Sequence, residues 1–84
     1  MERIELAEHP HARHRCWESG VPGHWRHVLL EVGTLDDGRP YAAQTNRRGT
    51  RAWAAYSERQ VCEAVEGWMR RLGTDWRETT GQDA

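Results

Sequence analysis

Apolar residues recur at helical spacing in the last third of the chain. They are Val61, Val65, Trp68, Met69 and Leu72. Ser57 stands at the position of an N-cap, Gln60 follows three residues later, and Gly73 comes directly after the last apolar residue. A capping residue at the start and a glycine at the end are typical of a complete helix. The pattern therefore predicts one helix over residues 58–72.

Upstream of this helix, three segments alternate between apolar and polar residues at the two-residue period of a strand. They span residues 27–34, 39–45 and 50–56. Asp37-Gly38 separates the first two, and Asn46-Arg47-Arg48-Gly49 separates the last two. Both sequences are typical of turns between antiparallel strands. We therefore predict a three-stranded antiparallel meander with one C-terminal helix packed on one face, an α+β fold.

The predicted meander carries apolar side chains on both faces. Alternation assigns Leu29, Trp53 and Ala55 to one face, and Leu30, Ala54 and Tyr56 to the other. The helix, with Trp68 as its largest side chain, covers only one of them. Residues 3–7 and 12–17 would extend or cover the sheet as one or two N-terminal strands, or else a second copy of the chain must cover it. Because open apolar surface favours association, we expect a homodimer or a protein partner.

The chain is short enough for a single domain, which we place at residues 1–75. Within it, residues 1–23 form a histidine-rich segment, 24–56 the meander and 57–73 the helix. Residues 76–84, polar apart from Trp76, are expected to form a disordered tail. No secretory signal and no apolar run of transmembrane length is present, so we expect a cytoplasmic protein without membrane contact. In that compartment Cys16 and Cys62 would be free thiols.

Arginine supplies every basic side chain except histidine, with twelve arginines and no lysine against thirteen acidic residues. The net charge of −1 lacks the basic excess of most nucleic-acid binders, so such binding would need a local patch. Arg47, Arg48 and Arg51 lie at the predicted hairpin tip and would clamp phosphates, while the nearby Trp53 would stack a base. The alternative is a solvated turn. We take these four residues as candidates for binding nucleic acid or a partner.

All five histidines lie in the first third of the chain, and His9, His11, His14 and Cys16 fall in one short run. Imidazole and thiolate groups are ligands for zinc or copper, so the run is a candidate metal site. No paired Cys-x2-Cys element accompanies it, and the alternative is a set of solvated side chains in a polar hairpin.

Catalytic signals are weaker. Cys16 and His14 would serve as nucleophile and base, but no third group that orients the base is evident, and no phosphate-binding or nucleophile-elbow motif occurs. We therefore predict a small non-enzymatic interaction module that binds a protein partner or nucleic acid. The alternative function is metal binding or metal sensing through the N-terminal histidine and cysteine cluster.

Overall fold

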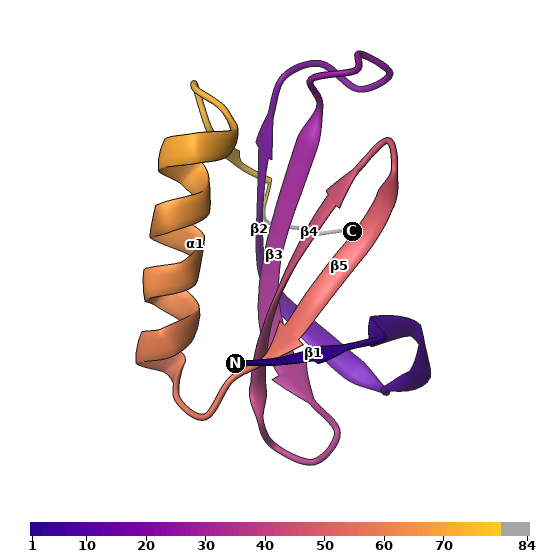
Figure 1. Cartoon of the computed structure of the whole chain (residues 1–84), viewed down its shortest axis with the longest axis vertical. Helices are drawn as coiled ribbons and strands as arrows, with labels where there is room; N and C mark the ends of the chain where they lie inside the picture. The colour runs from indigo at the N-terminus through magenta and orange to yellow at the C-terminus, as the bar shows by residue number, and fades with distance from the viewer. Residues whose placement is uncertain (80–84) are drawn as a thin grey trace.

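The computed structural model describes residues 1–79 and shows a six-stranded antiparallel sheet with one helix packed on one face (Figure 1). The elements are β1 (Glu2–Ile4), the 3-10 turn η1 (Leu6–Glu8), β2 (His11–Ser19), β3 (Val28–Leu35), β4 (Pro40–Asn46), β5 (Gly49–Ala54), α1 (Glu58–Leu72) and β6 (Arg77–Glu78). The strand order is β1-β5-β4-β3-β2-β6. The α+β prediction is confirmed, and the sheet is wider than the meander alone.

The helix has the bounds that its sequence predicts. The Ser57 hydroxyl oxygen accepts a hydrogen bond from the backbone N–H of Gln60 at 3.3 Å, and the Gln60 side chain accepts one from the N–H of Tyr56 at 2.8 Å. The first bond satisfies an amide group that the first turn of a helix leaves without a partner, and the second ties the residue before the cap to that turn. Arg70 and Arg71 lie in the last turn, where positive charge complements the helix dipole.

The central meander is β3-β4-β5, joined by the two predicted turns. Asp37 accepts a hydrogen bond from the N–H of Arg39 at 3.0 Å in the first turn. Asn46 accepts one from the N–H of Arg48 at 2.8 Å in the second, and Gly49 there adopts a φ of 124° that glycine tolerates best. Turn chemistry therefore places both hairpins where the sequence indicates.

The core between helix and sheet packs Trp68 of α1 against both small and large residues of the sheet. Ala42 and Leu30 are fully buried beneath Trp68, which is 7% exposed. The Trp53 ring lies 5.2 Å from that of Trp68. Our prediction that Trp53 and Ala55 lie on the face of Leu29, with Ala54 on the face of Leu30, was wrong. The tight turn after β4 sets a register in which Trp53 pairs with Ala42 and points to the helix side, with Leu30.

The opposite face of the sheet is covered by the N-terminal segment of the same chain. Strand β1 pairs with β5, so that Ile4 joins a second buried cluster with Leu35 and Tyr41, and Leu6 of η1 packs against it. Figure 1 shows this segment on the side of the sheet away from α1. Self-association stays a prediction, but an uncovered face is no longer a reason for it.

Tyr41 is the largest fully buried side chain of this second cluster. Its hydroxyl donates a hydrogen bond to a carboxylate oxygen of Glu31 at 2.6 Å. Burial, reinforced by this bond to an acidic group, raises the pKa of Tyr41 far above its ordinary value. The phenol therefore stays protonated and acts as a fixed donor.

Strand β2 carries most of the histidine-rich segment and pairs with β3, with a bulge between Arg13 and Arg15. Gly33 of β3 makes this pairing possible, because a Cβ there would overlap the carbonyl oxygen of Ala12 and lie 2.7 Å from the Tyr41 ring. The strand predicted at residues 12–17 is thus confirmed and longer, whereas the one predicted at 3–7 is shorter and ends in η1.

Regular structure continues past residue 75. Strand β6 pairs with the end of β2, and the Trp76 indole N–H donates to the carbonyl of Met69 at 3.0 Å. The sheet therefore includes the first residues of the segment expected to be a disordered tail, and residues 80–84 lie outside the described part of the chain. Within the described part, no helix is both long and apolar enough to cross a membrane.

Candidate nucleic-acid interface

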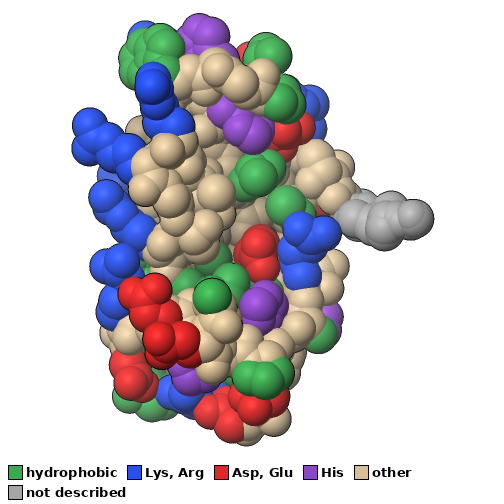
Figure 2. Space-filling view, turned by 90° about the vertical axis from the view of Figure 1, so that its right-hand side faces the viewer, with side chains coloured by type: hydrophobic (Ala, Val, Ile, Leu, Met, Phe, Trp, Pro, Cys, Tyr) green, Lys and Arg blue, Asp and Glu red, His purple; other side chains and the backbone are tan. Residues whose placement is uncertain are grey.

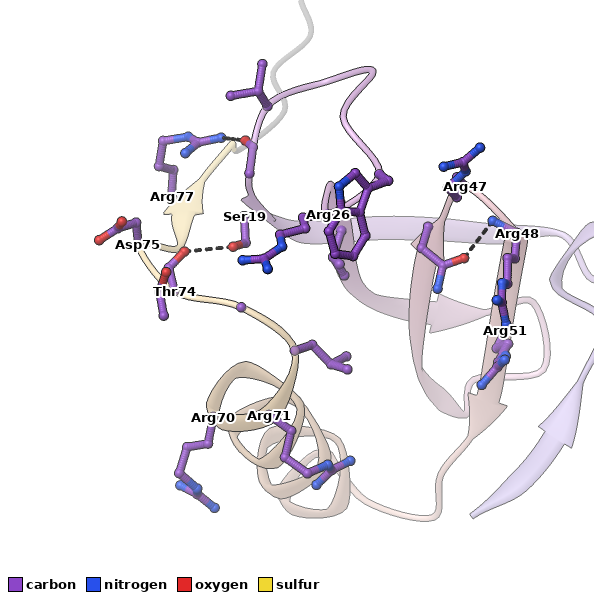
Figure 3. Close-up of a pocket in the computed structure, with 17 residues that line it drawn as sticks. Ser19, Arg26, Arg47, Arg48, Arg51, Arg70, Arg71, Thr74, Asp75 and Arg77 are labelled. Carbon is purple, nitrogen blue, oxygen red and sulfur yellow. Dashed lines mark hydrogen bonds between the residues drawn. The ribbon is translucent and has the colours of Figure 1, made fainter.

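Three connections meet at one end of the sheet and line an open cavity of about 1240 Å³. They are the loop between β2 and β3, the turn between β4 and β5, and the segment that follows α1 (Figures 1 and 3). In Figure 3, Arg70 and Arg71 lie at the helix end, Arg48 and Arg51 lie across the cavity on the hairpin, and Arg26 lies between them. The topology thus brings together segments that are far apart in the sequence.

Positive charge dominates this cavity. Its lining includes seven arginines and only one acidic residue, Asp75. The arginines are Arg26, Arg47, Arg48, Arg51, Arg70, Arg71 and Arg77, and all seven are exposed to solvent. We call this cavity, with its lining residues, the arginine cavity.

Most of these guanidinium groups have no acidic partner. Arg77 forms an ion pair with Glu18 at 3.2 Å and donates to the carbonyl of Gly20 at 2.6 Å. The other six form no ion pair with any carboxylate of residues 1–79. Elsewhere, Arg15 and Arg59 each form one ion pair and Arg39 forms two. Within residues 1–79, carboxylates therefore leave most of the positive charge of the arginine cavity uncompensated.

Acidic residues concentrate at the other end of the molecule. Glu2, Glu5 and Glu8 belong to the N-terminal segment, Asp36 and Asp37 to the turn between β3 and β4, and Glu58 to the start of α1. Figure 2 shows arginines along one edge of the face opposite the helix and most acidic side chains toward the bottom. The net charge of −1 therefore conceals two ends of opposite sign.

Hydrogen bonds hold the loop between β2 and β3 and the end of α1 in place. The buried Ser19 hydroxyl donates to the carbonyl of Thr74 at 2.7 Å, which ties the segment after the helix to β2. The Glu18 carboxylate bonds the His27 ring at 2.6 Å as well as Arg77, and these two partners lower the pKa of Glu18. Glu18 therefore stays ionised at neutral pH. From the end of β2, it bonds His27 at the end of the β2–β3 loop and Arg77 in β6.

The four residues predicted to bind nucleic acid or a partner are separated by the structure. Arg47, Arg48 and Arg51 line the arginine cavity, but Trp53 does not. It is half-buried against Trp68, with the guanidinium of Arg3 over its ring at 5.4 Å.

Sequence reasoning missed Arg26, Arg70, Arg71 and Arg77, along with Trp25, which also line the cavity. Trp25 is 59% exposed. No local pattern could have identified them, because each belongs to a different segment from the hairpin tip. The one available signal was the adjacent pair Arg70-Arg71 at the predicted helix end, and the helix dipole accounts for that pair equally well.

The candidate metal ligands do not converge. The His11 ring bonds the carbonyl of His9 at 2.7 Å and packs edge-on against Tyr41, while the His14 ring bonds the Thr34 hydroxyl at 2.8 Å. Cys16 is buried. Among residues 1–79, no three His, Cys, Asp or Glu side chains are arranged to hold a metal ion. Within the described residues, no hydrogen bond joins the proposed nucleophile Cys16 to the proposed base His14, whose Nε2 bonds Thr34. Cys16 and Cys62 are both free thiols.

Comparison of the chain with protein-family models, with curated proteins and with solved structures found no match. Function must therefore be inferred from the geometry and charge of the molecule itself.

Proposed function

We propose that this protein is a non-enzymatic binding module that holds the phosphate backbone of a nucleic acid in the arginine cavity. One observation carries the proposal: six arginines from three separate segments surround one cavity, and none has a carboxylate partner in residues 1–79. Guanidinium groups bind phosphate oxygens through two parallel hydrogen bonds, and such contacts supply most of the affinity of proteins for nucleic acids.

The energetic cost of this arrangement supports an anionic ligand. Like charges gathered at one end repel each other and destabilise the folded chain, and an anion removes that repulsion. The helix dipole offers a purely structural reason for Arg70 and Arg71, of about 0.3–1 kcal/mol each. It offers none for Arg26, Arg48 or Arg51, which lie on the loop, the turn and the sheet.

An acidic protein segment is the competing ligand. Carboxylates also bind arginine, and the opposite end of this molecule is itself acidic. The cavity favours nucleic acid because an exposed tryptophan, on which a base can stack, lies among its arginines. Arginine interleaved with an exposed aromatic ring is typical of nucleic-acid surfaces.

Fluorescence anisotropy with labelled oligonucleotides tests the proposal. We expect binding at low salt that weakens as salt increases, by about 0.7 to 0.9 logarithmic units per phosphate contact for each tenfold change. The double substitution Arg51→Gln and Arg71→Gln removes one arginine from each side of the cavity. It should reduce the magnitude of the salt slope by about 1.4 to 1.8.

The matched control is Arg13→Gln with Arg59→Gln. This variant has the same net charge, but neither residue lines the cavity, and the exposed pair of Arg59 with Glu63 contributes little stability. We expect the control to bind like the unmodified protein. An equal loss in both variants, or no binding of the unmodified protein at low salt, would show the proposal to be wrong.

A further inference from the structure

The arginine cavity also gathers most of the large exposed apolar side chains of the described chain. Five large hydrophobic residues are exposed in the described chain, and three of them, Val21, Trp25 and Leu72, line this cavity. A site that only clamps phosphates needs no apolar surface. The lining therefore indicates a ligand that brings both negative charge and a flat apolar group.

Trp25 is exposed but is held in a defined position. Two consecutive turns order its loop through hydrogen bonds from the N–H of His24 to the carbonyl of Val21 (2.9 Å) and from the N–H of His27 to the carbonyl of His24 (3.0 Å). The ring of His24 stacks on Trp25 with centroids 5.8 Å apart, and the guanidinium of Arg26 lies 4.7 Å from the Trp25 ring. This order lowers the entropy lost when a ligand stacks there.

We infer that the ligand is single-stranded nucleic acid, with a base stacked on the exposed Trp25 ring while its phosphates contact the arginines of the cavity. This inference rests on the proposed function. In a duplex the faces of the bases are stacked on one another, whereas an unpaired strand offers them to aromatic side chains. Trp25 and the arginines line the same cavity, so a short stretch of a single-stranded nucleic acid can contact both.

Reading the base sequence of a duplex would require another use of the hairpin that lines this cavity. The hairpin of β4 and β5 is a two-stranded ribbon, which is the kind of element that enters a major groove. Asn46 at its tip would be the residue to read an adenine through both its oxygen and its nitrogen. Its side-chain oxygen already accepts the N–H of Arg48, so the tip is organised as a turn and not for reading bases.

The experiment compares Trp25→Ala, Trp25→Phe and Tyr56→Ala in binding to a mixed-sequence single strand and to its duplex. Tyr56 is the matched control, since it is 77% exposed and does not line the cavity. One stacked base accounts for about a 5- to 150-fold difference in affinity. We expect Trp25→Ala to lose at least about fivefold for the single strand. Trp25→Phe should keep most of the affinity, and Tyr56→Ala should keep all of it.

For the duplex, we expect weaker binding that Trp25→Ala leaves unchanged. Near-ultraviolet circular dichroism confirms that each variant is folded. Equal affinities of Trp25→Ala and Tyr56→Ala for the single strand, or tighter binding of the duplex, would overturn this inference and leave the phosphate-binding function standing. Binding to neither oligonucleotide at low salt, including the case in which only an acidic peptide binds, would overturn both.

Discussion

The histidine-rich segment and the arginine cavity show opposite relations between sequence and space. In the first, sequence neighbours do not converge on one site, and in the second, distant residues do. His9, His11, His14 and Cys16 are neighbours in the sequence. The His11 ring bonds the His9 carbonyl, the His14 ring bonds Thr34 and Cys16 is buried, and no metal-binding group forms in the described chain. The arginines span residues 26–77 and line one cavity. Proximity along the chain is therefore a poor guide to a site in a protein built mostly from strands.

Strand geometry is the physical reason for the dispersed histidines. Successive side chains of a strand point to opposite faces, and the bulge between Arg13 and Arg15 changes the alternation within the cluster itself. The arginines converge for the complementary reason. In an antiparallel meander, every second connection lies at the same end of the sheet, as the β2–β3 loop and the β4–β5 turn do here. The last turn of α1 lies at that end too.

The largest effect is expected where the histidine-bearing strand meets the sheet. Gly33→Ala would place a methyl group on the carbonyl oxygen of Ala12 and against the Tyr41 ring, and neither can move without disturbing the sheet. We expect the free energy of unfolding to fall by about 3 kcal/mol or more, measured by urea denaturation. A loss below about 0.5 kcal/mol, typical of surface substitutions, would show that β2 does not approach β3 this closely.

A smaller effect is expected where the helix end meets the arginine cavity. A Cβ at Gly73 would overlap the hydroxyl oxygen of Ser19 and lie 2.8 Å from its Cβ. Gly73→Ala should cost about 1–3 kcal/mol in urea denaturation. It should also weaken oligonucleotide binding, because the segment that carries Arg70 and Arg71 must shift away from β2.

Gly67→Ala is the matched control for that substitution. Gly67 lies within α1, and an added Cβ would make only ordinary contact, 3.4 Å from the Arg71 side chain. Alanine is favoured over glycine inside helices by about 1 kcal/mol, so this variant should be more stable and should bind normally. Weaker binding by Gly67→Ala, or unchanged binding by Gly73→Ala, would contradict the link between the helix end and the cavity.

The smallest effect is expected from metal. A ligand that binds the folded state at a hundred times its dissociation constant stabilises it by about 2.7 kcal/mol, which a melting curve would detect. Because the histidines and Cys16 do not converge, we expect zinc and copper at neutral pH to leave the melting temperature unchanged. A rise that disappears in a variant lacking His11 and His14 would restore the metal hypothesis.

Local patterns identified the regular elements well. The apolar period and caps located α1 to the residue, and the two turn sequences located the meander to within a residue or two. They did not identify the face of the sheet on which the Trp53 side chain lies, because the alternation of residues alone does not give the register that a turn sets between two strands. They also failed for Trp76, which packs as a single aromatic side chain against the end of the helix.

Some residues of the candidate site could be identified from local sequence patterns, and others could not. Its hairpin arginines, Arg47, Arg48 and Arg51, were visible in the sequence because they surround a turn. Arg26, Arg70, Arg71 and Trp25 were not, because their role depends on three connections meeting at one end of the sheet. Composition showed that the protein is rich in arginine and near neutral overall, but not that its charges separate into two ends. Short-range order follows from bonds and contacts between near neighbours, which the sequence records directly. The arginine cavity follows from contacts between distant segments, which exist only after the sheet and helix have packed together.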